Sequence, residues 1–340
     1  MLSLVHSSEF EVFFLVFSPI SKNVSILLFF KSLSYTVRTI ANVFFLFFFP
    51  DFLETLILKR NCTDAILEKA CESSPYLHTV DISSSLLITD KSITALQTLK
   101  YLKNLDVFAT SITHEGTDIL LQLLPSTMNT LGCNSICKLN RFSQLKSLHT
   151  RIFSNYIPLN NFQNLNLKLH FCRNVDVSII IRECVNLKIF KLHSCSYSLN
   201  LQQTIRDCPA GLKRLFQFTL DKSSKFPSYP NIDKLIVQYA LNFVENIRHI
   251  YIESYAIFDE EFFEIFLHNN KLIYLEEMYL YAIYPNILEC DVICQIIKQC
   301  PNLSILNTRG YALTGVENIQ QKLRSEFPGI KININMDSNE

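Results

Sequence analysis

The stretch Leu53-Glu54-Thr55-Leu56-Ile57-Leu58 decides the fold of this chain, because apolar residues stand at its first, fourth and sixth positions. Successive side chains of a β-strand point to opposite faces, so Leu56 and Leu58 face inward while Ile57 faces out. Leu53 fills the bend before the strand. The same spacing recurs clearly at residues 77–82, 102–107, 187–192, 232–237, 247–252, 275–280 and 303–306, and more weakly at 128–131, 145–148, 162–169, 212–215 and 330–334.

The copies follow one another at a nearly constant distance. Leu53, Leu77 and Leu102 are 24 and 25 residues apart, and the copies that start at 247, 275 and 303 are 28 residues apart. This period accommodates one strand and one helix per unit and is typical of leucine-rich repeats. We therefore expect an α/β solenoid, a curved horseshoe with a parallel sheet on its concave face and helices on its convex face.

A single repeat buries only one edge of itself, so neighbouring repeats must stack to close a continuous core. The copies predict one elongated solenoid of about 12–13 units over residues 52–336. Residues 337–340 form a polar tail, and residues 1–51 form a separate segment of different composition.

The segment 1–51 is rich in phenylalanine, since 11 of the 27 phenylalanines lie at or before Phe49. Its apolar runs are shorter than the roughly 20 residues that span a membrane. Glu9 and Glu11 precede the first run, which is atypical of a signal peptide. Three interpretations stay open: a membrane-associated hairpin, an apolar cap on the first repeat, or sequence that the mature protein lacks.

The composition disfavours several classes of function. Lysine plus arginine equals aspartate plus glutamate at 31 each, so no net field indicates a nucleic-acid partner. Six glycines in 340 residues, with no phosphate-binding motif, argue against nucleotide cofactors. Hydrolase motifs such as G-x-S-x-G and H-E-x-x-H are also absent. We expect no catalysis and no cofactor.

The 11 cysteines fall at repeat positions, as Cys184 and Cys300 do just before a strand copy. Such cysteines are typical of small core residues in a reducing compartment, which predicts an intracellular protein, cytoplasmic or nuclear. The pair Cys290 and Cys294 and the pair Cys133 and Cys137 lack further ligands at zinc-motif spacing, so we expect core packing and no metal.

Several helix ends carry a further signature. The phrase Cys300-Pro301-Asn302-Leu303 leads from an expected helix into a strand copy, and related phrases occur at residues 74–77, 184–187 and 208–212. This pattern resembles the cysteine-containing repeats of F-box/leucine-rich-repeat proteins, and residues 102–116 resemble those of zyg-eleven-type cullin receptors. The resemblance covers residues 52–336.

The resemblance implies a non-catalytic protein-interaction module that serves as the substrate-recognition arm of a cullin–RING ubiquitin ligase, with a cullin adaptor as a further partner. In the family an N-terminal F-box contacts the adaptor. Residues 1–51 contain no recognisable F-box, and the chain has no tryptophan. The alternative is a leucine-rich-repeat scaffold or regulatory protein without a ligase link.

The outward strand positions form the default contact surface of such a solenoid. They predict a protein-binding concave face with a basic centre and an acidic, tyrosine-rich C-terminal arm, because tyrosine is enriched at binding hot spots. The predicted contact residues are Lys146, His149, Arg151, Lys188, Lys191, His193, Lys213, Arg214, Tyr251, Glu253, Glu276, Tyr279 and Tyr281.

Overall fold

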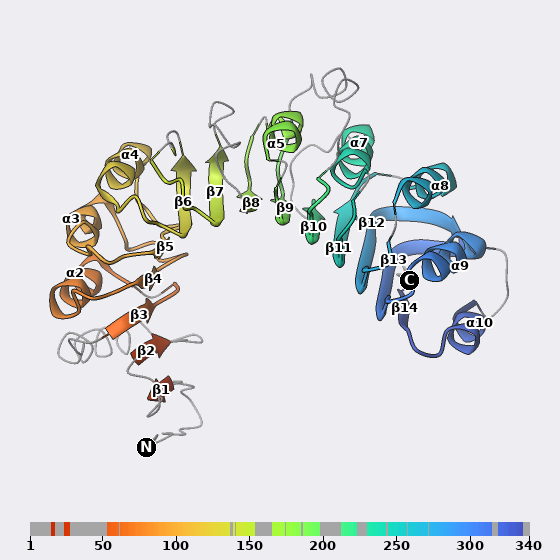
Figure 1. Ribbon diagram of the computed structural model, residues 1–340, viewed down its shortest axis with the longest axis horizontal. Helices are drawn as coiled ribbons and strands as arrows, with labels where there is room; N and C mark the ends of the chain where they lie inside the picture. The colour runs from red at the N-terminus through yellow and green to blue at the C-terminus, as the bar shows by residue number, and fades with distance from the viewer. Residues whose placement is uncertain are drawn as a thin grey trace. The chain divides into compact units, whose positions relative to one another are not determined.

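The computed structural model describes residues 15–17, 24–27, 53–60, 62–136, 139, 141–153, 165–173, 175–184, 186–197, 212–222, 230–242, 244–256, 258–270, 272–314 and 319–335. The chain folds as two compact units, Met1–Ile157 and Pro158–Glu340. In both units helices are interspersed between strands along the chain (Figure 1).

The sheet of the first unit is parallel from β2 onward, and each strand pairs with the next along the chain. Its first two strands pair antiparallel. The strands are β1 (Leu15–Phe17), β2 (Val24–Leu27), β3 (Leu53–Ile57), β4 (Thr79–Asp81), β5 (Asn104–Asp106), β6 (Thr130–Ile136) and β7 (Ser147–Phe153). The helices are α2 (Asp64–Ser73), η1 (Asp90–Ser92), α3 (Ile93–Leu96) and α4 (His114–Leu123).

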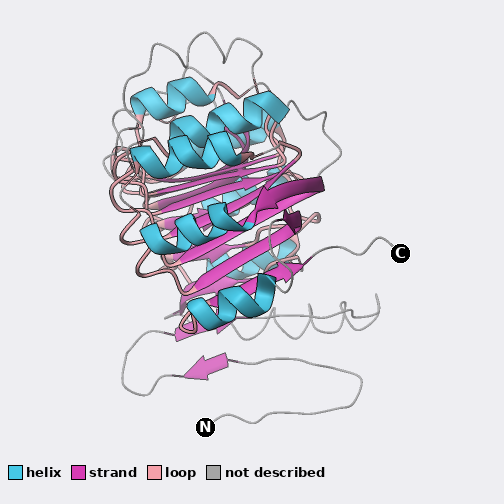
Figure 2. Ribbon diagram, turned by 90° about the vertical axis from the view of Figure 1, so that its right-hand side faces the viewer, coloured by secondary structure: helices cyan, strands magenta, loops and turns pink. Residues whose placement is uncertain are grey.

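The sheet of the second unit is parallel throughout its described strands. Its strands are β8 (Asn166–His170), β9 (Ile189–His193), β10 (Gln217–Asp221), β11 (His249–Ser254), β12 (Glu277–Glu289), β13 (Ile305–Thr314) and β14 (Lys331–Asn335). Its helices are α5 (Val177–Glu183), α7 (Pro230–Ala240), α8 (Glu260–Asn269), α9 (Cys290–Gln299) and α10 (Ile319–Glu326). Figure 2 shows the helices of this unit gathered on one side of its strands.

The apolar pattern of the sequence becomes the core, as the spacing predicts. Leu53, Leu56 and Leu58 are all buried, and so are their counterparts in the copies at residues 77–82, 102–107, 187–192, 247–252 and 275–280. In the second unit one line of inward residues runs across seven paired strands: Leu167, Phe190, Phe218, Ile250, Met278, Leu306 and Ile332. Burying each such side chain stabilises the folded chain by about 1.5–3 kcal/mol. Together these side chains form the apolar interface between neighbouring repeats. The α/β leucine-rich-repeat fold is confirmed.

Helix α2 shows why the segment after each strand becomes helical. The side chain of Thr63 caps the helix by accepting a hydrogen bond from the Ile66 N–H. The buried residues Ile66, Leu67 and Ala70 recur at helical spacing and face the sheet. Ser74, the residue after the helix, ends it in a non-helical conformation.

Two strand predictions near residue 230 are wrong. Residues 232–237 belong to helix α7, whose buried residues Ile232, Ile236, Val237 and Ala240 follow a helical period. Pro230 is the first residue of that helix, a position where its missing N–H costs nothing. The weak copy at 212–215 precedes the strand, which runs over Gln217–Asp221.

Most of residues 1–51 lie outside the described residues, as do 336–340. Within the described segments, β2 pairs parallel with β3, so backbone of this segment extends the first sheet. The described part of the chain contains no helix that is long and apolar enough to cross a membrane.

A candidate protein-binding face on strands β8–β12

The sheet of the second unit carries ordered rows of outward side chains on the side opposite the helices, which we call the open face. Neighbouring strands are in register, so side chains on adjacent strands stand about 4.8 Å apart along a row. The middle row runs Lys168, Lys191, Thr219, Tyr251, Tyr279 on β8 to β12. The outer row runs His170, His193, Asp221, Glu253, Tyr281 on the same strands.

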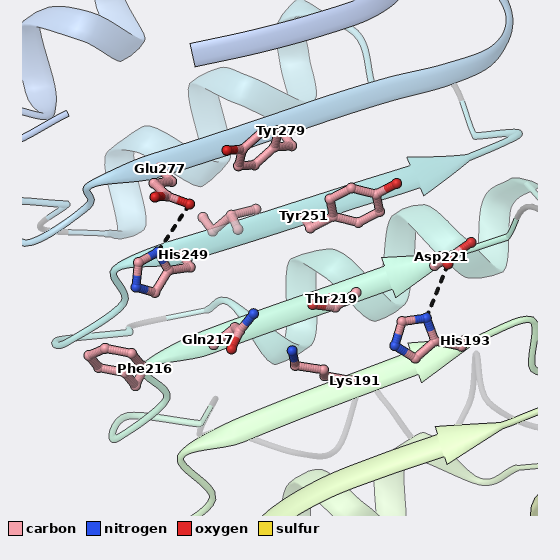
Figure 3. A pocket seen from close by; sticks show the side chains of 11 residues that line it. Lys191, His193, Phe216, Gln217, Thr219, Asp221, His249, Tyr251, Glu277 and Tyr279 are labelled. Atoms are coloured by element: carbon pink, nitrogen blue, oxygen red, sulfur yellow. Dashed lines mark hydrogen bonds and ion pairs between the residues drawn. The ribbon is translucent and has the colours of Figure 1, made fainter. Parts of the chain in front are cut away.

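A depression of about 490 Å³ lies in the centre of the open face (Figure 3). Thr219 forms its floor, because this outward residue is only 5% exposed between larger neighbours. Lys191 and His193 line it from β9, and Tyr251 and Tyr279 line it from β11 and β12. The depression therefore has a lysine ammonium group on one side and aromatic rings on the other.

Two histidines of the depression are engaged with acids of the next strand. His193 Nδ1 lies 3.1 Å from Asp221 Oδ2, and His249 Nδ1 lies 3.5 Å from Glu277 Oε2. These pairs are drawn as dashed lines in Figure 3. The ring of His193 also stacks on His170, with ring centroids 4.3 Å apart. These contacts hold the imidazoles in place as rigid walls of the depression.

Three tyrosines form a cluster next to the depression. The ring centroid of Tyr251 lies 6.1 Å from that of Tyr279 and 5.3 Å from that of Tyr281. The Tyr251 hydroxyl donates to Glu253 Oε2 at 2.6 Å. Burial, together with Glu253, raises the pKa of Tyr251, and burial with Glu277 raises the pKa of Tyr279. Both phenols therefore stay neutral, and the cluster offers rigid aromatic area with hydroxyl groups.

Two lysines stand side by side at the other end of the middle row. Lys168 on β8 and Lys191 on β9 are direct partners in the register. Burial, with the nearby charge of Lys168, lowers the pKa of Lys191. Among the described residues, neither lysine forms an ion pair with a carboxylate. Like charges directly opposite each other on paired strands destabilise a sheet, so this pair has an electrostatic cost.

The first unit uses its outward residues differently. Asp106 on β5 leans over Gly132 on β6, so that its Oδ2 lies 3.6 Å from His149 Nδ1 on β7. The His149 ring stacks on Phe108 at 3.8 Å between centroids, and the Arg151 guanidinium lies over the same Phe108 ring. His149 and Arg151 are therefore packed against their own sheet.

The predicted contact residues fall into several groups. Lys146, His149 and Arg151 belong to the first unit, whereas the other ten belong to the second. Lys146, Lys188 and Glu276 lie immediately before strands β7, β9 and β12. Glu276 Oε1 pairs with Arg248 Nη1 at 2.8 Å. The structure places Lys191, His193, Tyr251, Glu253, Tyr279 and Tyr281 on the open face.

The structure does not place Lys213 and Arg214 on a strand of the open face. Both residues are exposed in the turn before β10, and the positions between Lys191 and Tyr251 are taken by Thr219 and its strand. Leu212 and Leu215 match the strand spacing in the sequence, but the strand begins two residues after Leu215, at Gln217. The spacing Leu215, Phe218, Leu220 identifies the true strand once phenylalanine is accepted at a leucine position.

Four residues of the middle and outer rows are missing from the prediction, namely Lys168, His170, Thr219 and Asp221. The alternation Leu165, Leu167, Leu169 shows that Lys168 and His170 face out. The sequence alone does not indicate that Thr219 forms the floor of the depression. That role depends on which side chains flank it on the neighbouring strands, and strand pairing determines those side chains.

The described cysteines are free thiols that lie in the core. Burial raises the pKa of Cys71, Cys184 and Cys300 to about 12, so these thiols stay protonated. In the part of the chain that the structure describes, no group of three or more histidine, cysteine or acidic side chains is arranged to hold a metal ion.

Comparisons with known proteins find likeness at the level of backbone only. No protein-family model matches the chain, and no curated protein sequence matches it. An internalin, InlF, of Listeria monocytogenes is similar with 16% identity and a TM-score of 0.45, over 84% of this chain and 81% of the internalin. A leucine-rich-repeat protein of Leptospira interrogans has 13% identity and a TM-score of 0.40, over 88% and 81%.

A further similar structure is the complex of Rad7 and Elc1 in yeast, with 13% identity and a TM-score of 0.45 over 86% of this chain and 83% of the matched chain. The fold of this chain as an α/β leucine-rich-repeat protein rests on its own repeats: the inward apolar line, the parallel register and the capped helices.

Proposed function

We propose that this protein is a non-catalytic protein-interaction module that binds a protein partner on the open face of strands β8–β12. The depression over Thr219 carries the proposal, because it combines concave shape, neutral tyrosines and fixed polar groups on a rigid sheet. Tyrosine supplies large contact area with few rotatable bonds, and such residues dominate binding energy at interfaces.

The chemistry of the depression supports binding rather than catalysis. The imidazoles of His193 and His249 are held by acids, but no serine or cysteine nucleophile is among the residues that line the depression. Nucleophilic catalysis needs a nucleophile within hydrogen-bond reach of its base. A pair of acid-bound imidazoles is a fixed hydrogen-bonding surface, which suits recognition of a peptide.

The test is affinity capture with matched variants. Tagged wild-type protein and the variant Tyr251→Ala/Tyr279→Ala are expressed in cells, and bound proteins are quantified by mass spectrometry. The control is Tyr76→Ala/Tyr101→Ala, which removes a second neighbouring tyrosine pair, with ring centroids 5.6 Å apart, in the first unit. We expect partners that are lost with the first variant and retained with the control. Equal recovery with both variants contradicts the proposed site.

A second and more specific candidate function is that the protein serves as the substrate-recognition arm of a cullin–RING ubiquitin ligase, with a cullin adaptor as an additional partner. The sequence phrase Cys300-Pro301-Asn302-Leu303 favours it, since it resembles the repeats of F-box/leucine-rich-repeat proteins. In this function the partner on the open face is a ubiquitination substrate. The same mass-spectrometry experiment tests it: recovery of cullin components with wild-type protein supports the ligase arm, and partners without them favour a scaffold.

A further inference from the structure

The lysine pair and two of the three clustered tyrosines lie in the middle row. Lys168 and Lys191 lie at one end of this row, on β8 and β9. Thr219 lies in its middle, at the floor of the depression, and Tyr251 and Tyr279 lie at the other end, on β11 and β12. Because the five positions are in register, a chain that crosses the strands along this row meets the cations, the depression and the aromatic rings in sequence.

The lysine pair is arranged for an anion. The two ammonium groups extend from adjacent strands on the same face, so each raises the cost of keeping the other charged. The nearest acid of the outer row, Asp221, is already engaged by His193. A negatively charged group that binds here neutralises two charges that the described part of the chain leaves without an acidic partner, which makes binding electrostatically complementary.

The kind of anion follows from lysine chemistry and from the spacing. Lysine is a compact point charge, whereas planar bidentate groups are matched by the fork of arginine. Two point charges on adjacent strands, about 4.8 Å apart at the backbone, suit two separate carboxylates. Residues two apart on an extended chain point to the same side at a spacing of about 6.6 Å, which long lysine side chains can reach.

We propose that the open face binds an extended acidic segment of a protein partner, with two nearby aspartate or glutamate side chains on Lys168 and Lys191 and a large apolar or aromatic side chain in the depression over Thr219. The inference rests on the proposed function and specifies its partner. Lys191 and Tyr251 are two strands apart, about 10 Å, so the apolar residue lies two or four residues from the nearer acidic residue, the even separations that keep both side chains on the bound side.

The acidic groups at the far end of the face support this orientation. Glu253 and Glu277 lie beside Tyr251 and Tyr279, so an acidic chain end placed there would meet like charge. The segment therefore lies with its acidic residues over β8 and β9 and its apolar residue toward β11.

The test uses the full chain and a phage-displayed library of random 12-residue peptides. Selected peptides are synthesised and their affinities measured by fluorescence polarisation against wild-type protein, Lys168→Glu/Lys191→Glu and Lys168→Arg/Lys191→Arg. The control Lys298→Glu/Lys322→Glu changes the net charge equally on helices α9 and α10. Circular dichroism and thermal unfolding show whether each variant is folded.

The expected result is enrichment of peptides with two carboxylates two residues apart and an apolar residue a further two or four residues along the chain. Their affinity falls at least about tenfold with the glutamate pair, which corresponds to 1.4 kcal/mol or more, and stays within about threefold with the arginine pair and the control. Affinity also decreases as salt is raised from low to physiological concentration.

Other outcomes separate the inference from the proposed function. Neutral or basic peptides that bind Lys168→Glu/Lys191→Glu as well as wild type, and lose affinity with Tyr251→Ala/Tyr279→Ala, overturn the acidic partner and leave the binding face intact. If the wild-type protein enriches no peptides beyond those that Tyr251→Ala/Tyr279→Ala enriches, both the acidic partner and the proposed binding face are overturned. If phosphoserine in place of the peptide glutamates binds more than about tenfold tighter, the carboxylate partner is overturned in favour of a phosphorylated one.

Discussion

Asp64 accepts two hydrogen bonds from Thr89, which lies one repeat further along the chain: one from its backbone N–H at 2.9 Å and one from its hydroxyl at 2.7 Å. Asp90 accepts the same two bonds from Thr113, at 2.8 and 2.7 Å. Each threonine also caps its own helix. Neighbouring helices of the first unit are thus joined by carboxylates in addition to the apolar core.

Replacing Asp64 with alanine removes the acceptor for Thr89 and leaves its amide without that partner. We expect the free energy of unfolding to fall by about 1–3 kcal/mol, because bonds to a charged acceptor are stronger than neutral ones. Urea unfolding followed by circular dichroism measures it. The control Glu68→Ala, an exposed residue of the same helix, is expected to change stability by less than about 0.5 kcal/mol. Equal effects of the two changes would refute the carboxylate link.

The same carboxylates predict sensitivity to acid. Burial alone would raise the pKa of Asp64, but hydrogen bonds from Ser92 and Thr89 outweigh it and hold the pKa below its ordinary value. Burial is likewise outweighed at Asp259, whose pKa is lowered by Lys234, with Nζ 2.9 Å from both carboxylate oxygens.

A folded-state pKa below the unfolded value means that the stabilisation is present above the unfolded pKa and is lost as pH falls through the folded one. We therefore expect wild-type stability to decrease below about pH 4. The variant Asp64→Asn/Asp259→Asn should be less stable at neutral pH and lose less on acidification. Parallel stability curves from pH 7 to pH 2 would show that these carboxylates do not control acid unfolding.

Gly132 is required by the carboxylate that lies over it. A Cβ built at this glycine would stand 2.2 Å from Asp106 Oδ1, and the other oxygen of that carboxylate, Oδ2, contacts His149 on the next strand. Gly132→Ala is expected to cost about 1–3 kcal/mol through overpacking. Shortening the acid in Gly132→Ala/Asp106→Ala should recover part of the loss. Gly329→Ala is the control, since no atom lies within 4 Å of its added Cβ. A loss that Asp106→Ala does not reduce would place the strain elsewhere.

The second unit contains a buried ion pair that ties helix α7 to the end of β10. Lys222 Nζ lies 3.6 Å from Asp233 Oδ1, and the two side chains are 5% and 0% exposed. Lys222 also donates to the carbonyl of Cys195 and lies over the Tyr197 ring. Burial lowers the pKa of Lys222 and raises the pKa of Asp233 despite their attraction.

Lys222→Met leaves the Asp233 carboxylate buried and unpaired, which is expected to cost about 3–5 kcal/mol. The double change Lys222→Met/Asp233→Asn removes the lone charge and keeps an acceptor for the Ser254 hydroxyl, so it should be more stable than Lys222→Met alone. A buried carboxylate with a raised pKa is stabilising when protonated and loses that stability as pH rises. The deficit of Lys222→Met should therefore shrink as pH is lowered from neutral, because protonation removes the buried charge. A deficit that is independent of pH would contradict this assignment.

Much of the fold is predictable from the sequence because the inward positions repeat with period two inside each strand and with a period of 24–28 residues between strands. The errors arise where the same spacing of apolar residues is compatible with both a strand and a helix. Ile232, Leu235 and Val237 match the strand spacing, but Ile236, Ala240 and Leu241 extend a helical stripe that only a longer window reveals.

The open face was predicted in part, since Lys191, His193, Tyr251, Glu253, Tyr279 and Tyr281 lie on it. What the sequence could not supply is the register of one strand on the next. That register places Lys168 opposite Lys191 and places the small side chain of Thr219 between larger side chains on both neighbouring strands. Both depend on pairing between strands that are distant along the chain, which no local pattern encodes.

The central claim, that a protein partner binds the open face, is tested most directly by site-specific photocrosslinking in cells. A photoreactive phenylalanine analogue replaces Gln217, which lines the depression, or Gln295, which is exposed on helix α9. We predict a crosslinked protein at position 217 that disappears with Lys168→Glu/Lys191→Glu and is absent at position 295. Crosslinks to a partner at position 295 alone would contradict the account and place the interface on the helices.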